Sequence, residues 1–255
     1  MAGSAPWQAE AFRLTAFPLT PRPFNTEAWW TATIGSQPEV RLSQPRVGVQ
    51  VEEAAHGGGK LSLVVDADRL HWGLVAADGG TSTNVEVPSL GPFEETIGDF
   101  RALGERWFLD GSYPGSSRLA FGATLSIPVR DRTSGLVVMR SFLHSVNIDT
   151  EGMSDFAYQV NRPRKSSTGI PNLEINRLSK WAVVTREQKA IRITAVGVEE
   201  SGSQPTTACI VEMDINTAPR SELKLASQES VLVFQELLNF AIEISRAGDI
   251  PWLAR

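Results

Sequence analysis

Short runs in which apolar and polar residues alternate recur along this 255-residue chain, and they constrain its fold more than any other feature. Such alternation places one face of a strand in a core and the other face toward water. The first run covers residues 12–17, and the next three cover residues 46–51, 61–65 and 70–75. Turn residues separate the last three runs, so we expect them to form an antiparallel meander.

Two longer segments have apolar residues at the three-to-four spacing of a helix with one buried face. The first begins at Pro92, a residue favoured at the first position of a helix, and stops before Gly111. The second covers about residues 227–247, with Ser227 as the expected cap and Gly248 as the stop. A brief helix is also expected just after Asn25.

Together these patterns predict an α+β protein in two halves, each a mostly antiparallel sheet with a packed amphipathic helix. The polar segment 130–135 is the expected boundary, which gives halves at 1–130 and 131–255. Further strands are expected at 119–127, 155–160, 173–184, 190–198 and 207–215. Both halves place strands before a helix, which would fit an internal duplication, although the residues themselves do not repeat.

Composition places the chain among ordinary globular proteins. Apolar residues make up 42% and charged residues 21%, which excludes wholesale disorder. The single cysteine, Cys209, excludes an internal disulfide and fits a reducing compartment. We find no signal peptide, and the apolar runs are far shorter than a membrane span. A cytoplasmic protein without membrane association is therefore expected.

Charge is distributed unevenly along the chain. Residues 161–192 include eight basic and two acidic side chains, a net charge of +6, whereas the whole chain carries −5 and the remainder therefore −11. Such asymmetry indicates an anionic partner. Segment 161–169 is expected to be a flexible loop, and the strands after it continue the basic segment. The expected partner-binding residues are Arg162, Arg164, Lys165, Arg177 and Lys180.

The nature of this partner stays open at the level of sequence. Basic residues on a loop and on strands could follow a phosphate backbone, and Trp181 and Tyr158 could stack on bases. The acidic overall balance and the lack of an RNA-recognition or zinc-finger signature argue against nucleic acid. We therefore expect a protein partner, with nucleic acid as the alternative.

One pair of carboxylates provides a rival, enzymatic interpretation. Glu212 and Asp214 alternate along an expected strand, so both lie on one face, where they could hold a divalent cation or perform acid–base chemistry. A solvated strand face with ion pairs to the basic strands is the favoured alternative. The sequence contains no assembled catalytic set, and no metal or other cofactor is expected.

Several isolated residues invite a functional interpretation that their context does not support. The segment Gly57–Lys60 resembles part of a phosphate-binding loop, but a strand follows it instead of a helix, so a hairpin turn is expected. The three histidines are too scattered to predict a metal site: His56, His71 and His144. Cys209 lies in an apolar strand and is expected to be buried, as are the seven tryptophans.

Three segments carry a resemblance to a known family. They are similar to a sporadically distributed, uncharacterised bacterial protein family of comparable length. The segments are residues 118–122, in the strand after the first long helix, residues 211–216, before the last helix, and residues 234–244, within that helix. The resemblance implies an α+β fold, a prokaryotic cytoplasmic setting and no catalytic residues. The patchy distribution of that family fits an accessory system, such as anti-phage defence or toxin control.

These observations lead to one leading functional hypothesis and two alternatives. The sequence predicts a non-enzymatic accessory or interaction protein that binds a macromolecular partner. The alternatives are a nucleic-acid-binding module and a metal-dependent hydrolase or nuclease that uses Glu212 and Asp214.

Overall fold

The computed structural model describes residues 6–20, 24–44, 46–77, 87–186, 189–194, 197–202, 205–220 and 222–249 of the chain. These residues form one sheet of ten strands, a second sheet of two strands and four helices. Both sheets are antiparallel in the described part of the chain. The expected α+β class is therefore confirmed. No described helix has the length and apolar character needed to cross a lipid bilayer.

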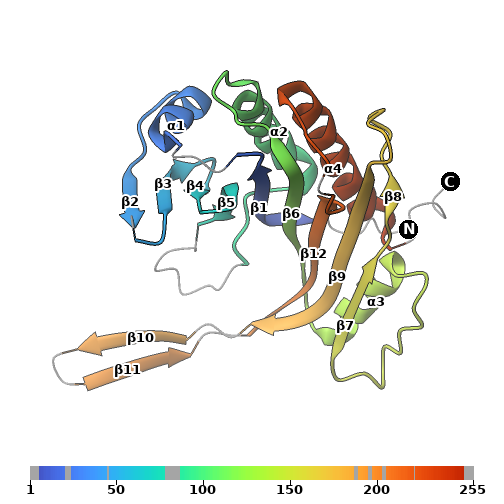
Figure 1. The fold of residues 1–255 in the computed structure, drawn as a ribbon. Helices are drawn as coiled ribbons and strands as arrows, with labels where there is room; N and C mark the ends of the chain where they lie inside the picture. Colours follow the sequence, from blue (N-terminus) through green and yellow to red (C-terminus); the bar gives the residue numbers. More distant parts are fainter. Residues whose placement is uncertain are drawn as a thin grey trace.

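The elements follow one another in an order that repeats. The first part of the chain contains β1 (Gln8–Pro18), α1 (Thr26–Ile34), β2 (Val40–Gln44), β3 (Val49–His56), β4 (Gly59–Val65), β5 (Leu70–Ala76) and α2 (Phe93–Leu109). The second part contains β6 (Ser116–Val129), α3 (Arg132–Phe142), β7 (Phe156–Asn161), β8 (Arg164–Lys165), β9 (Glu174–Arg186), β12 (Thr206–Thr217) and α4 (Ser227–Ala247). Between β9 and β12 lie β10 (Lys189–Thr194) and β11 (Gly197–Gly202), which form a hairpin that extends away from the large sheet (Figure 1).

The two halves share one sheet, so two halves with a sheet each are not confirmed. The strands of the large sheet lie in the order β2-β3-β4-β5-β1-β6-β12-β9-β7, and β8 also pairs with β9. The first strands of the two halves, β1 and β6, pair with each other, with Phe12 opposite Ala123 and Ala16 opposite Leu119. The order of strand, helix, strands and helix nevertheless occurs twice along the chain.

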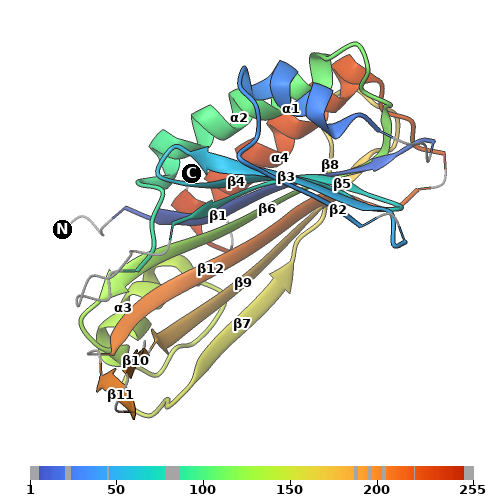
Figure 2. The ribbon, with the colours of Figure 1, turned by 90° about the vertical axis from the view of Figure 1, so that its left-hand side faces the viewer.

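All four described helices pack on one face of the large sheet (Figures 1 and 2). Aromatic rings fill the layer between them. Phe12 of β1 contacts Phe100 of α2 with a centroid distance of 5.3 Å, and Phe121 of β6 lies 6.4 Å from Phe234 of α4. Such ring pairs add about 0.5–1.5 kcal/mol to the hydrophobic gain from burial. The six tryptophans that the structure describes are all buried, as expected, and Trp252 lies outside the described residues.

Several boundaries differ from the sequence-based expectation. The segment expected as a polar boundary contains the start of α3, because the side chain of Asp131 caps this helix by accepting a hydrogen bond of 2.8 Å from the backbone N–H of Ser134. The single strand expected at 190–198 is instead a hairpin, β10 and β11. Ser227 is the first residue of α4 and not its cap. The N–H of Ala226, before it, donates to the side chain of Glu229.

Two glycines of α2 give a direct test of the helix packing. A Cβ at Gly104 would overlap the ring of Phe234 and lie 3.0 Å from Leu14, whereas a Cβ at Gly98 would meet nothing within 4 Å. We expect Gly104→Ala to lower the free energy of unfolding by about 1–3 kcal/mol, because the buried ring must move. Gly98→Ala should raise it by about 0.5–1 kcal/mol, because alanine favours the helix. Urea denaturation measures both, and stabilisation by both variants would contradict this packing.

Candidate functional site

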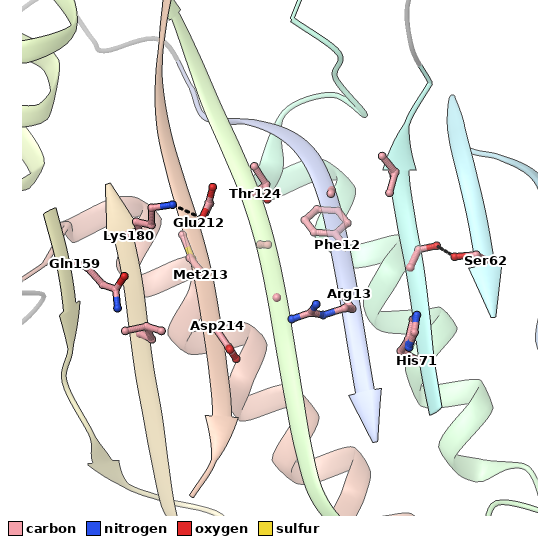
Figure 3. A pocket seen from close by; sticks show the side chains of 16 residues that line it. Phe12, Arg13, Ser62, His71, Thr124, Gln159, Lys180, Glu212, Met213 and Asp214 are labelled. Carbon is pink, nitrogen blue, oxygen red and sulfur yellow. Dashed lines mark hydrogen bonds and ion pairs between the residues drawn. The ribbon is translucent and has the colours of Figure 1, made fainter. Parts of the chain in front are cut away.

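The face of the large sheet opposite the helices is exposed, and we call it the open face. Its centre is hollowed over about 550 Å³, and residues of seven strands, β4, β5, β1, β6, β12, β9 and β7, surround this central hollow (Figure 3). Because successive side chains of a strand point to opposite faces, the side chains that project onto the open face come from every second residue of each strand. The main polar contributors are Arg13 of β1, His71 of β5, Lys180 of β9, and Glu212 and Asp214 of β12.

Arg13 lies between two glycines. The register places Gly73 of β5 opposite it on one side and Gly122 of β6 on the other. The guanidinium extends toward β6, and a Cβ at Gly122 would lie 3.6 Å from its Nε and Nη2 atoms (Figure 3). An isolated glycine within a strand often marks a close approach of another group. The sequence contained this signal, but only the pairing of the strands shows that both glycines flank the same arginine.

Three other cations of the open face have partners within the sheet. Lys60 of β4 lies 3.3 Å from Glu53 of β3, and Lys180 of β9 lies 3.2 Å from Glu212 of β12. Arg186 of β9 forms two contacts with Glu10 of β1, of 2.9 and 3.1 Å.

Arg118 of β6, on the same face, donates a 3.0 Å hydrogen bond to Asn216 and lies over the ring of Phe17. Arg13, by contrast, makes no hydrogen bond or ion pair with the residues that the structure describes. It is therefore the unpaired cation at the centre of the open face.

His71 is held in its neutral form at the rim of the central hollow. Burial is the main cause that lowers its pKa below the ordinary value of 6.5, and the positive charges of Arg13 and Arg69 lower it further. Asp66 acts in the opposite direction. At neutral pH the imidazole can therefore donate and accept hydrogen bonds beside Arg13 without adding a second positive charge.

Glu212 and Asp214 lie on the same face, in agreement with the strand pattern. Glu212 forms the ion pair with Lys180, and Asp214 accepts a 3.0 Å hydrogen bond from the side chain of Asn216. Across the described residues there is no group of three or more His, Cys, Asp and Glu side chains that could hold a metal ion. The hydrolase alternative thus has two carboxylates that are engaged with neighbouring side chains.

Cys209 faces the helices and is fully buried, as expected. Burial raises the pKa of its thiol to about 12, so the thiolate that would act as a nucleophile is not formed at neutral pH.

The five residues expected to bind a partner do not form one surface. Arg177 and Lys180 lie on opposite faces of β9: Lys180 lines the central hollow, and Arg177 is 2% exposed beneath α4. There the Arg177 guanidinium lies 3.4 Å from Glu243 and over the ring of Phe240. Burial is the main reason that the pKa of Arg177 falls to about 10.

The remaining three residues of that set lie on the segment expected to be a flexible loop. Arg164 pairs with Glu243 at 3.1 Å, and Arg162 lies 3.6 Å from the buried Asp249, just beyond α4. Lys165 is exposed. Four of the five predicted residues, all except Lys165, therefore face carboxylates of the same chain.

Hydrogen bonds also fasten this segment to α4. The side chain of Glu236 accepts bonds from the backbone N–H of Ser167 at 2.6 Å, from its hydroxyl at 2.7 Å, and from the hydroxyl of Ser166. Residues 164–165 form β8 on the edge of β9. The segment is thus part of the packed structure, and internal carboxylates absorb much of the charge that stands out in the sequence.

The pKa of His71 reports on the charge of Arg13. We expect Arg13→Gln to raise this pKa in part, because burial, the larger cause, remains. Since the folded protein disfavours the protonated imidazole, His71 contributes stability above pH 6.5 that is lost as the pH falls toward its folded pKa. The Arg13→Gln variant should lose less stability over this pH range. NMR titration of the ring measures the shift. Arg101→Gln, on the helix layer, is the control, and an equal shift in both variants would contradict the proposed proximity.

The buried ion pair under α4 should matter for stability. Glu243→Gln leaves Arg177 buried without a carboxylate, so we expect the free energy of unfolding to fall by about 3 kcal/mol. Lys165→Gln changes an exposed side chain of the same segment and should change it by less than about 0.5 kcal/mol. Chemical denaturation compares the two variants, and equal stabilities would show that Arg177 does not depend on Glu243.

Comparisons of the chain with protein-family models, with curated proteins and with solved structures found no match.

Proposed function

We propose that the chain is a non-enzymatic protein-binding module that receives a partner protein on the open face of its sheet. The observation that carries this proposal is a row of apolar side chains that leads across the open face to the central hollow. An antiparallel sheet with one solvated face is common, but that face is normally polar. Exposed apolar side chains that adjoin one another are typical of interaction surfaces.

The apolar row follows from the strand registers. Leu42 of β2 lies opposite Val51 of β3, Val51 lies opposite Val64 of β4, and Val64 lies opposite His71 at the rim of the hollow. Leu42 is 50% exposed, and so is Val75, which lines the hollow itself. A partner that covers this row would gain roughly 25 cal/mol for each Å² of apolar surface removed from water.

The charges of the open face favour a protein over nucleic acid. A phosphate backbone is bound by cations that are free to replace its counterions. Here Lys60, Lys180 and Arg186 are each paired with a carboxylate of the same face. Phosphates laid across the sheet would also meet Glu212 and Asp214 in the hollow. A protein surface with apolar side chains and few charges complements this face better.

Other parts of the functional hypothesis depend on the sequence alone. A cytoplasmic setting and a role in prokaryotic defence or toxin control come from composition and from the family resemblance, and we retain them as parts of the proposal. The proposal of a protein partner does not depend on them.

Two exposed apolar residues on opposite sides of the molecule give a matched test. Val75 on the open face is 50% exposed, and Leu232 on α4 is 49% exposed. A lysine at Val75 should weaken binding of a partner about tenfold or more, because it places a charge in an apolar contact, whereas Leu232→Lys should have little effect. The protein and both variants are used as baits in nuclease-treated lysate of the native host, and the recovered partner is then titrated against each.

Two outcomes of this experiment would contradict the proposal. Equal affinities of a recovered partner for the Val75→Lys and Leu232→Lys variants would exclude the open face as its binding site. Material that is captured from untreated lysate but not from nuclease-treated lysate would favour the nucleic-acid alternative.

A further inference from the structure

We propose that Arg13 in the central hollow binds the carboxylate of an acidic side chain of the partner protein, with apolar partner residues beside it. This inference rests on the proposed function, because it specifies which chemistry a protein must present to the open face. It assigns the hollow as the subsite that selects the partner.

The first argument is that Arg13 lacks an anion while its neighbours have one. The cations around it on the open face pair with carboxylates at 2.9–3.3 Å, and Arg118 donates to Asn216. Arg13 is exposed and has no such partner among the described residues. A guanidinium can bind a carboxylate through two parallel N–H···O bonds, and such charge-assisted bonds are about twice as strong as neutral ones.

The second argument is that the strand on the β6 side of Arg13 leaves room for a ligand, whereas on the β5 side the Ser62 hydroxyl would lie 3.1 Å from a Cβ at Gly73. Gly73 and Gly122 lie opposite it and project no side chain onto the open face. A Cβ at Gly122 would meet the guanidinium at 3.6 Å, in ordinary contact, so a longer side chain there would compete with a ligand for the space over β6. The glycines therefore keep the guanidinium accessible in the middle of a ten-stranded sheet.

The charges that line the hollow favour a single carboxylate over a phosphate. Glu212 and Asp214 of β12 border the same hollow, and a dianion beside them would be repelled more strongly than a monoanion. His71, held neutral, can donate one hydrogen bond to an oxygen of the ligand. Two cations and two carboxylates line the hollow, and Lys180 pairs with Glu212, so Arg13 is the lining cation that remains for one carboxylate of a ligand.

The surroundings also predict what lies next to the acid in the partner sequence. The row of Leu42, Val51 and Val64 approaches the hollow from β2, and Val75 lies on its rim. An Asp or Glu side chain on Arg13 would thus bring the neighbouring partner residues onto apolar surface. We expect a recognised segment with one acidic residue flanked by apolar residues.

The test selects binders of the full-length protein, used as bait, from a random peptide library. The library is displayed in two forms, one with internal peptides and one with free C-termini. The wild type and Lys60→Gln, which removes a cation that is already paired, should enrich internal peptides with an acidic residue beside apolar ones. Arg13→Glu should enrich Lys or Arg at that position. For a synthetic peptide from the wild-type selection, Arg13→Gln should weaken binding about 10- to 100-fold.

Failure of this inference can be told apart from failure of the proposed function. The role of Arg13 would be overturned if the enriched peptides showed no acidic preference or bound Arg13→Glu as well as the wild type. If Val75→Lys no longer bound these peptides, the open face would remain a protein-binding surface. Enrichment of free C-termini alone would overturn the acidic side chain as the source of the carboxylate. If the wild type enriches no peptide, or Val75→Lys binds the enriched peptides unchanged, both proposals are wrong.

Discussion

The antiparallel pairing of β1 with β6 is the contact on which the rest of the architecture depends. These strands begin the two halves of the chain, and without the pairing each half would expose a row of unpaired backbone N–H and C=O groups at its inner edge. The pairing makes one continuous face from two short sheets. It also sets the register that places Arg13 opposite Gly122, so the same contact that joins the halves builds the centre of the open face.

One face of this sheet packs against the helices, and the other is exposed. Aromatic side chains of β1 and β6 pack against α2 and α4, and Gly104 lets the Phe234 ring approach the axis of α2 closely. Because this packing buries most of one face, the sheet needs no cover on its other side to be stable. Residues of the open face are then free to serve binding. The open face departs from a plain solvated face in two ways: it has an apolar row, and the cation at its centre has no partner among the described residues.

The sequence predicted local features well and contacts between distant segments poorly. The meander of β3, β4 and β5, the helix α2 and the bounds of α4 follow from periodicity and caps, which are properties of neighbouring residues. The structure separates the residues of the basic segment that the sequence groups together, for two reasons. Positions 177 and 180 differ by an odd number within one strand, so their side chains must face opposite sides, which the alternation itself implies. The carboxylates that pair with Arg162, Arg164 and Arg177 come from α4 and the residues just after it, and no local pattern predicts that contact. The sequence alone does not single out Arg13, because Gly73 and Gly122 become its neighbours only through strand register.

An unpaired arginine at the centre of an interface selects against partners as well as for them. A partner that covers the open face removes water from Arg13, and a buried cation without an anion is strongly unfavourable. A protein that supplies apolar contacts but no carboxylate would therefore lose much of the free energy that the apolar row provides. The carboxylates at Glu212 and Asp214 act similarly against an excess of negative charge. Under the proposed function, binding would then require one acid in one place, so the open face would discriminate among partners of equal hydrophobicity.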